Sequence, residues 1–146
     1  MKMKFAAALT AILFLALPAV GTAAGKTTGY DVSIPALMAN PEFQARLPAG
    51  VKYYFADEPA AVKSSLGALD TSRRTSNGKG ASSCDWAMIS ALTALGDEAL
   101  KRGGNAVVGI QSNLDGVATS SRTRYRCGLG TLMVNVALTG EAVIVD

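Results

Sequence analysis

Residues 82–111 read SSCDWAMISALTALGDEALKRGGNAVVGIQ, and this stretch decides the fold. At the helical period, its apolar and polar side chains fall on opposite sides, which predicts an amphipathic helix that lies on an apolar surface. Ser82 followed three residues later by Asp85 predicts a capping-box start for this helix. The predicted apolar side consists of Cys84, Met88, Ile89, Leu92, Leu95, Gly96 and Ala99.

The predicted helix ends at a structural turn formed by Gly103, Gly104 and Asn105. Glycine often follows the last helical residue because it adopts the left-handed conformation without steric cost. The next residues, AVVGI at 106–110, form a short apolar run that suits a strand buried on both faces. The stretch therefore predicts a helix, a glycine turn and a buried strand, in that order.

The N-terminus has the pattern of an export signal. Lys2 and Lys4 precede an apolar run at 5–19, and Thr22 and Ala24 suit the −3 and −1 positions of a cleavage site. The run is shorter than the roughly 20 residues of a membrane span, although a retained anchor is the alternative. We expect a signal peptide at 1–24, an N-terminal extension with a short helix at 25–50, and a single α+β domain at 51–146.

Leader cleavage also changes the charge balance. The full chain has 14 Lys and Arg residues against 11 Asp and Glu residues. Without Lys2 and Lys4 the net charge is +1, so the remaining chain has no overall basic field. We therefore expect a periplasmic protein that has no membrane span after cleavage and does not bind nucleic acid.

The two cysteines, Cys84 and Cys127, predict one disulfide, because an even count in an oxidising compartment is typical of structural pairing. The bond would join the start of the central helix to a later strand. The alternative is a redox pair or half of a metal site. The chain has no CxxC motif and no histidine, which favours the structural disulfide.

The segments before the central helix predict one short helix and one strand. Asn40 as N-cap and Pro41 at the first helical position predict a helix at 41–47. VKYYF at 51–55 is aromatic and β-branched, and predicts the first strand of the sheet. Residues 56–83 are rich in Gly, Ser and charge, and predict a long surface loop that is either a binding element or merely mobile.

The C-terminal third predicts three more strands. RTRYRCGLG at 122–130 alternates in polarity, and follows a turn region at 112–121 with Asp115-Gly116 at its tip. Residues 132–138 and 142–145 predict two strands joined by a tight turn at Thr139-Gly140. The expected fold is α+β, with one long helix packed on a mostly antiparallel four- to five-stranded sheet and one disulfide.

Arg122, Arg124 and Arg126 lie on one predicted face of the strand at 122–130. Guanidinium groups spaced about 7 Å apart can contact phosphate groups, carboxylate groups or a partner protein. The alternative is a solvated strand face on which charge opposes aggregation. These three arginines are the candidate anion or partner contact.

Catalytic motifs are not recognisable in the sequence. GTAAGKT at 21–27 lacks the glycine spacing of a phosphate-binding loop, and no serine lies in a GxSxG pattern. The lack of histidine removes the usual catalytic triads and most zinc sites. We therefore expect no catalytic residues, no metal and no cofactor.

Several segments resemble known proteins, namely PALMANPEFQARL, VKYYFADEP, CDWA, GGNAVVGIQSN, YRCGLG and VALTGEAV. The helix followed by GxNAVV resembles the C-terminal domain of the Rcs-system stress-sensor lipoprotein and the YbjQ-like domains. Over residues 32–145 the chain looks more like small exported proteobacterial proteins often labelled "excinuclease ATPase subunit", although it has no ATPase motif. The resemblance implies a sensor-like fold that acts through protein contacts, and ring-forming or metal-binding behaviour for YbjQ-like domains.

These observations favour a non-catalytic periplasmic binding or adaptor protein with a role in envelope stress or quality control. Its expected partner is an envelope protein, and a homo-oligomer is also compatible with the sequence. The alternative is a small-ligand or metal-ion binding domain that uses the arginine strand or the Ser/Gly-rich segment. A third class is an enzyme with an unfamiliar site.

Overall fold

The computed structural model describes residues 28–146. The expected signal peptide and the GTAAGKT segment lie outside the described residues. The elements are β1 (Thr28–Ser33), α1 (Ile34–Met38), α2 (Pro41–Gln44), β2 (Lys52–Phe55), β3 (Val62–Ser76), the 3-10 turn η1 (Asn77–Lys79), α3 (Ala81–Lys101), β4 (Ala106–Leu114), β5 (Val117–Thr119), β6 (Arg124–Leu129) and β7 (Met133–Val145).

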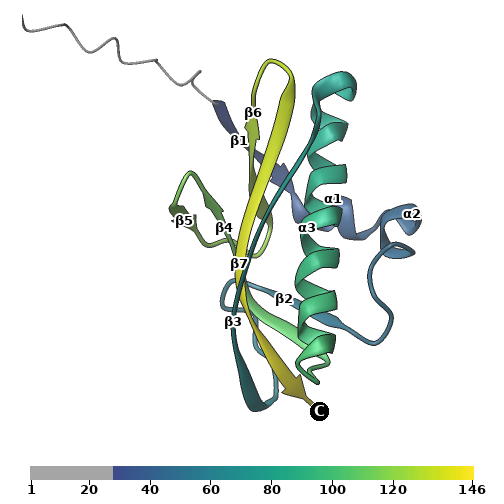
Figure 1. Ribbon diagram of the computed structural model, residues 1–146, viewed down its shortest axis with the longest axis vertical. Coiled ribbons are helices and arrows are strands. Elements are labelled where there is room, and N and C mark those ends of the chain that lie inside the picture. Colours follow the sequence, from purple (N-terminus) through teal and green to yellow (C-terminus); the bar gives the residue numbers. More distant parts are fainter. Residues whose placement is uncertain (1–27) are drawn as a thin grey trace, which may run out of the picture.

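The α+β fold is confirmed. Figure 1 shows α3 running along one side of the sheet, with the short helices α1 and α2 beside it. The sheet has seven strands rather than four or five, in the order β1-β6-β7-β4-β2, with β3 added to β7 and β5 added to β4. Every pairing is antiparallel except β2 with β4.

The predicted apolar side of α3 forms the centre of the core. Met88, Leu92 and Leu95 are buried against strands β6 and β7, which contribute residues such as Tyr125 and Val136. Burial of these side chains is the main stabilising term for a long helix of this kind, because each large apolar side chain contributes about 1.5–3 kcal/mol. Among residues 28–146, no helix is both long enough and apolar enough to cross a membrane.

The start of β4 is buried on both faces, as the AVVGI run predicts. Val107 belongs to the main core under α3, whereas Ala106 belongs to a second, smaller cluster with Val143 and Val145. From Ile110 onwards the strand alternates between buried and half-buried residues. The second cluster therefore covers only the beginning of the strand.

The predicted loop at 56–83 is wrong over most of its length. Residues Val62–Ser76 form β3, a 15-residue strand that pairs antiparallel with the whole of β7. Leu69 is its only buried side chain, because the rest of the strand faces solvent or the margin of α3. A strand with so little apolar alternation carries no period-2 signal, so its composition resembles that of a loop.

The predicted turn at Thr139-Gly140 is also wrong, because β7 runs unbroken through both residues. Gly140 pairs with Leu69 of β3, and Thr139 pairs with Asp70. A Cβ at position 140 would lie 2.9 Å from Val107 Cγ1. Here glycine permits a close approach between neighbouring strands rather than a reversal of the chain.

VKYYF is not the first strand, because β1 precedes it and pairs with β6. Ile34, Leu37 and Phe43 belong to the main core, so the proposed division at residue 50 falls inside one packed unit. The cap at α2 is confirmed, since Asn40 Oδ1 accepts from the Glu42 amide at 2.9 Å. The predicted turn with Asp115-Gly116 at its tip is present as the reversal between β4 and β5, although the residues on either side of the tip belong to these two strands.

Candidate functional site

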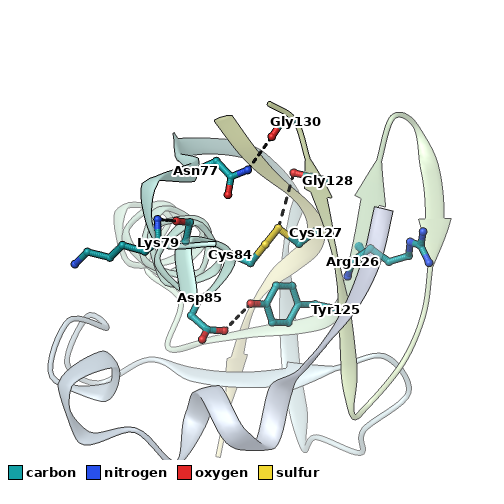
Figure 2. Close-up of a disulfide and its surroundings, with 11 residues drawn as sticks. Asn77, Lys79, Cys84, Asp85, Tyr125, Arg126, Cys127, Gly128 and Gly130 are labelled. Carbon is teal, nitrogen blue, oxygen red and sulfur yellow. Dashed lines mark hydrogen bonds between the residues drawn. A yellow bond between two sulfur atoms is a disulfide. The ribbon is translucent and has the colours of Figure 1, made fainter. Parts of the chain in front are cut away.

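The Cys84–Cys127 disulfide is present and joins the first turns of α3 to β6 across 5.9 Å between Cα atoms (Figure 2). Both cysteines are fully buried, so the bond lies inside the core and not at an accessible surface. This environment suits a structural cross-link better than a redox site, because reactive cysteines are usually partly exposed. Within residues 28–146, no group of three or more Cys, Asp or Glu residues lies close enough to hold a metal ion.

The predicted capping box at the start of α3 is wrong. The helix begins at Ala81 behind Gly80, and no side chain caps it. Ser82 donates to the Lys79 carbonyl, whereas Asp85 accepts a hydrogen bond of 2.9 Å from the Tyr125 phenol (Figure 2). The Asp85 carboxylate therefore connects α3 to β6 and does not bind the backbone of α3 itself. The spacing of Ser82 and Asp85 along the chain does not predict this tertiary contact.

Three tyrosines have raised pKa values, and burial is the main cause at each. The pKa of Tyr125 is raised strongly by burial and further by the neighbouring Asp85 carboxylate. Burial also raises the pKa of Tyr30 and of Tyr53, whose hydroxyl donates to the Leu92 carbonyl at 3.1 Å. These phenols stay protonated at neutral pH, and those of Tyr125 and Tyr53 act as hydrogen-bond donors. The buried Tyr30 hydroxyl has no hydrogen-bond partner among residues 28–146.

The structure does not bring the three predicted arginines together as free cations. Arg122 lies just before β6 and donates to Asp57 Oδ1 at 2.7 Å. The hydrogen bond and the adjacent charge lower the pKa of the Asp57 carboxyl. Arg126 forms an ion pair with Asp31 of β1 at 3.2 Å. Arg124 is exposed and forms no ion pair with any of residues 28–146, so it alone keeps the character of the predicted anion contact.

The predicted turn at Gly103, Gly104 and Asn105 is present. Gly103 has a φ of 84°, in the left-handed region that favours glycine. Asn105 then acts as a bridge between strands, because its side chain donates to the Val145 carbonyl at 3.0 Å and accepts from the Val145 amide at 2.7 Å. The turn is therefore structural and fixes the end of β7.

Two hollows lie between β3 and α3. One groove of about 450 Å³ lies along the C-terminal half of the helix. A second, of about 440 Å³, lies between the end of β3 and the first turns of α3, beside Trp86. Together they follow one edge of β3. The first groove is lined by residues 68–73 of β3 and by Ala94, Leu95, Asp97, Glu98, Lys101 and Arg102 of α3.

Strand β3 is an edge strand, because β7 is its only strand partner within the described chain. The Arg102 guanidinium donates to the carbonyl oxygens of Leu66 and Ala68 at 3.2 and 3.1 Å. The Arg73 guanidinium donates to the Ser72 carbonyl at 3.1 Å. The carbonyl groups of Ala68 and Ser72 therefore point away from β7, toward the groove side.

The far end of β3 gives the same orientation. The Asn77 backbone amide donates to the Leu132 carbonyl at 2.9 Å. The odd-numbered residues of β3 therefore direct their backbone N–H and C=O groups toward β7. The register is continuous from residue 68 to residue 76, and backbone groups alternate in direction along a strand. The N–H groups of Asp70, Ser72 and Arg74 are therefore directed outward, along an unpaired edge.

Sequence reasoning missed this edge because it assigned the segment to a loop. The available signal was weak: Val62, Thr71 and Thr75 are the β-branched residues of the run, and they are too far apart to give a regular alternation. The edge itself is a property of topology, since β3 pairs with β7 on one side and with no other strand of the described chain. No pattern within residues 62–76 indicates that the second side stays unpaired.

Comparison with known proteins identifies one distant structural similarity. No family model and no curated protein matches the sequence. Among solved structures, the chain is similar to a protein of unknown function of the DUF74 family from Pediococcus pentosaceus. The two are 12% identical, the match covers 66% of this chain and 99% of that chain, and the TM-score is 0.47.

Proposed function

We propose that this chain is a non-catalytic binding protein of the periplasm, which recognises an extended segment of an envelope protein at the free edge of β3. The observation that carries the proposal is the row of outward N–H groups at Asp70, Ser72 and Arg74, beside the groove along α3. An unpaired edge of this kind can accept a further strand. Main-chain hydrogen bonds then supply the affinity.

The groove suits an extended chain with mixed side chains. Asp97 and Lys101 on the helix wall supply both charges, so the wall does not select one sign of charge. Recognition that depends mainly on backbone groups is only weakly selective for sequence. It suits unpaired segments of partly unfolded envelope proteins, which is the link to a role in quality control.

The compartment rests on separate support. The export pattern at 1–24 and the buried disulfide both favour an oxidising environment. Arg102 and Arg73 cover part of the edge in the unbound protein by donating to its carbonyl groups. Such cover opposes uncontrolled strand pairing, and a bound segment would displace the Arg73 contact.

The test compares two substitutions at one outward position. Ser72→Pro removes the outward N–H, whereas Ser72→Ala keeps it and removes only the hydroxyl bond to Asn135. The unchanged protein, Ser72→Pro and Ser72→Ala are each cross-linked in intact cells, and captured proteins are identified by mass spectrometry. We expect an envelope protein to be captured by the unchanged protein and by Ser72→Ala, and capture to fall about tenfold or more in Ser72→Pro, the effect of one lost main-chain hydrogen bond in a desolvated site.

A peptide from the captured protein then locates the contact by amide hydrogen exchange. Exchange should slow on binding at Asp70, Ser72 and Arg74, and not at Arg124. If Ser72→Pro captured the partner as well as the unchanged protein does, the edge of β3 would not be the binding site. Capture that depends on Arg124 instead would place the partner on the predicted arginine face. If the protein cross-linked only to itself, self-assembly and not binding of a partner protein would explain the free edge.

A further inference from the structure

The end of the molecule formed by the β6–β7 turn and the start of α3 has an unusual surface. Figure 1 shows these two segments at the same end of the fold. Leu132 is 78% exposed and Met133 is 44% exposed, which makes them two of the few large exposed apolar side chains among residues 28–146. Arg74 and Lys79 are exposed on the adjoining end of β3 and on η1. We call Arg74, Lys79, Leu132 and Met133 the basic tip.

The turn that carries Leu132 is held in place rather than loose. The Asn77 amide donates to the Leu132 carbonyl at 2.9 Å, and Asn77 Nδ2 donates to the Gly130 carbonyl at 2.8 Å (Figure 2). The Gly130 amide closes the turn on the Met133 carbonyl at 2.9 Å. The backbone is therefore fixed while the Leu132 side chain projects into solvent, so its exposure is a built feature.

The charge around the basic tip has a single sign. The segments 71–84 and 128–140 contain no Asp or Glu, and neither Arg74 nor Lys79 forms an ion pair with the described part of the chain. The start of α3 has no side-chain cap, so its N–H groups add partial positive charge at the same end. The nearest carboxylate along α3, Asp85, accepts from Tyr125 and faces β6.

We propose that the basic tip docks reversibly on a surface of anionic phospholipid. Leu132 and Met133 enter the interface between headgroups and acyl chains, while Arg74 and Lys79 contact lipid phosphates. A projecting hairpin turn with two apolar side chains suits shallow insertion into such a surface, since interfacial binding grows with buried apolar area and with attraction to anionic lipids. A specific protein interface would need about 800 Å² on each partner, more than a projecting turn offers.

The proposal does not depend on strand addition at β3, because Ser72 lies on the edge and not at the tip. The protein purified from the periplasmic fraction is mixed with vesicles of equal parts phosphatidylglycerol and phosphatidylcholine, or of phosphatidylcholine alone, and sedimented. We expect binding to the anionic vesicles only, weakened by added salt. Ser72→Pro should bind these vesicles as the unchanged protein does.

Matched substitutions locate the contact. Leu132→Ser with Met133→Ser should weaken vesicle binding about tenfold or more, whereas Val117→Ser, at another turn and 65% exposed, should leave it unchanged. Lys79→Ala should weaken binding about fivefold, the effect expected for one cation near an anionic surface. Lys101→Ala is its control, because that side chain is 75% exposed and lies at the opposite end of α3.

Four outcomes would overturn the proposal. The first is equal binding to both kinds of vesicle, and the second is binding that the tip substitutions do not change. The third is binding to a soluble polyglutamate peptide without binding to vesicles, which would assign the basic tip to an acidic protein. Loss of vesicle binding on adding millimolar inorganic phosphate, at constant ionic strength, would likewise point to a phosphate ligand rather than a lipid surface.

Discussion

The Tyr125 phenol donates a hydrogen bond of 2.9 Å to the Asp85 carboxylate, and so joins β6 to the first turns of α3. Asp85 follows Cys84 directly, and Tyr125 lies two residues before Cys127. The same two elements are thus joined by a covalent bond and by a charged hydrogen bond side by side. Both contacts therefore hold the first turns of α3 against β6.

Tyr125→Phe should destabilise the fold by about 1.5–3 kcal/mol, the usual range for a hydrogen bond to a charged group. The substitution leaves the half-buried Asp85 carboxylate without its hydrogen-bond donor, and it changes the volume of the side chain at position 125 only slightly. Urea denaturation measures the free energy of unfolding. Tyr54→Phe is the control, since Tyr54 is half-buried at the second cluster, and its substitution should cost under about 0.5 kcal/mol. Equal losses for both would mean that the bond to Asp85 adds nothing.

The raised tyrosine pKa values predict a loss of stability in alkali. Burial raises the pKa of Tyr125, Tyr53 and Tyr30 above the ordinary value of 10.0. Above pH 10 the unfolded chain releases these protons while the folded chain keeps them, so the free energy of unfolding falls as pH rises. Below that pH the contribution is constant. Urea denaturation from neutral pH to about pH 11 should show this fall, with a shallower slope for Tyr125→Phe. An unchanged slope would contradict the prediction.

The sequence predicts well the parts of the fold that depend on local pattern. The amphipathic face of α3, the turn at Gly103 and the short helix after Asn40 each follow from neighbouring residues, and all are present. The cysteine pairing follows from a count of two and from the expected compartment. The first three features are determined by residues of a single element, and the fourth by the only possible pairing of two cysteines.

The features that the sequence misses depend on contacts between distant elements. Strand β3 has one buried side chain, so its structure depends on pairing with β7 and not on its own pattern. Asp85 is spaced as a cap but bonds to Tyr125, because β6 brings a better donor within reach. The ion pairs of Arg122 and Arg126 were missed for the same reason, because Asp57 and Asp31 come from other parts of the chain.

The orientation of the β3 edge predicts opposite effects for neighbouring proline substitutions. Thr71 lies opposite Leu138 with its N–H directed toward β7, so Thr71→Pro removes a ladder bond and should cost about 2 kcal/mol or more. Ser72→Pro removes an N–H that points away from β7 and should cost under about 1 kcal/mol beyond Ser72→Ala. Urea denaturation of the three variants makes the comparison. Equal losses for the two prolines would show that the outward row is assigned to the wrong residues.

Gly140 lies in the middle of β7, where its role is close packing, and Gly140→Ala tests this directly. The added Cβ would lie 2.9 Å from Val107 Cγ1 and 3.3 Å from the Val108 carbonyl oxygen, so the neighbouring strand must move. We expect a loss of about 1–3 kcal/mol, the usual cost of overpacking, measured by urea denaturation. Gly78→Ala is the matched control, because its Cβ would meet nothing nearer than 3.7 Å and its loss should stay under about 0.5 kcal/mol. If Gly140→Ala were tolerated equally well, position 140 would have room for a side chain, and the close approach between β4 and β7 would not be the reason for glycine there.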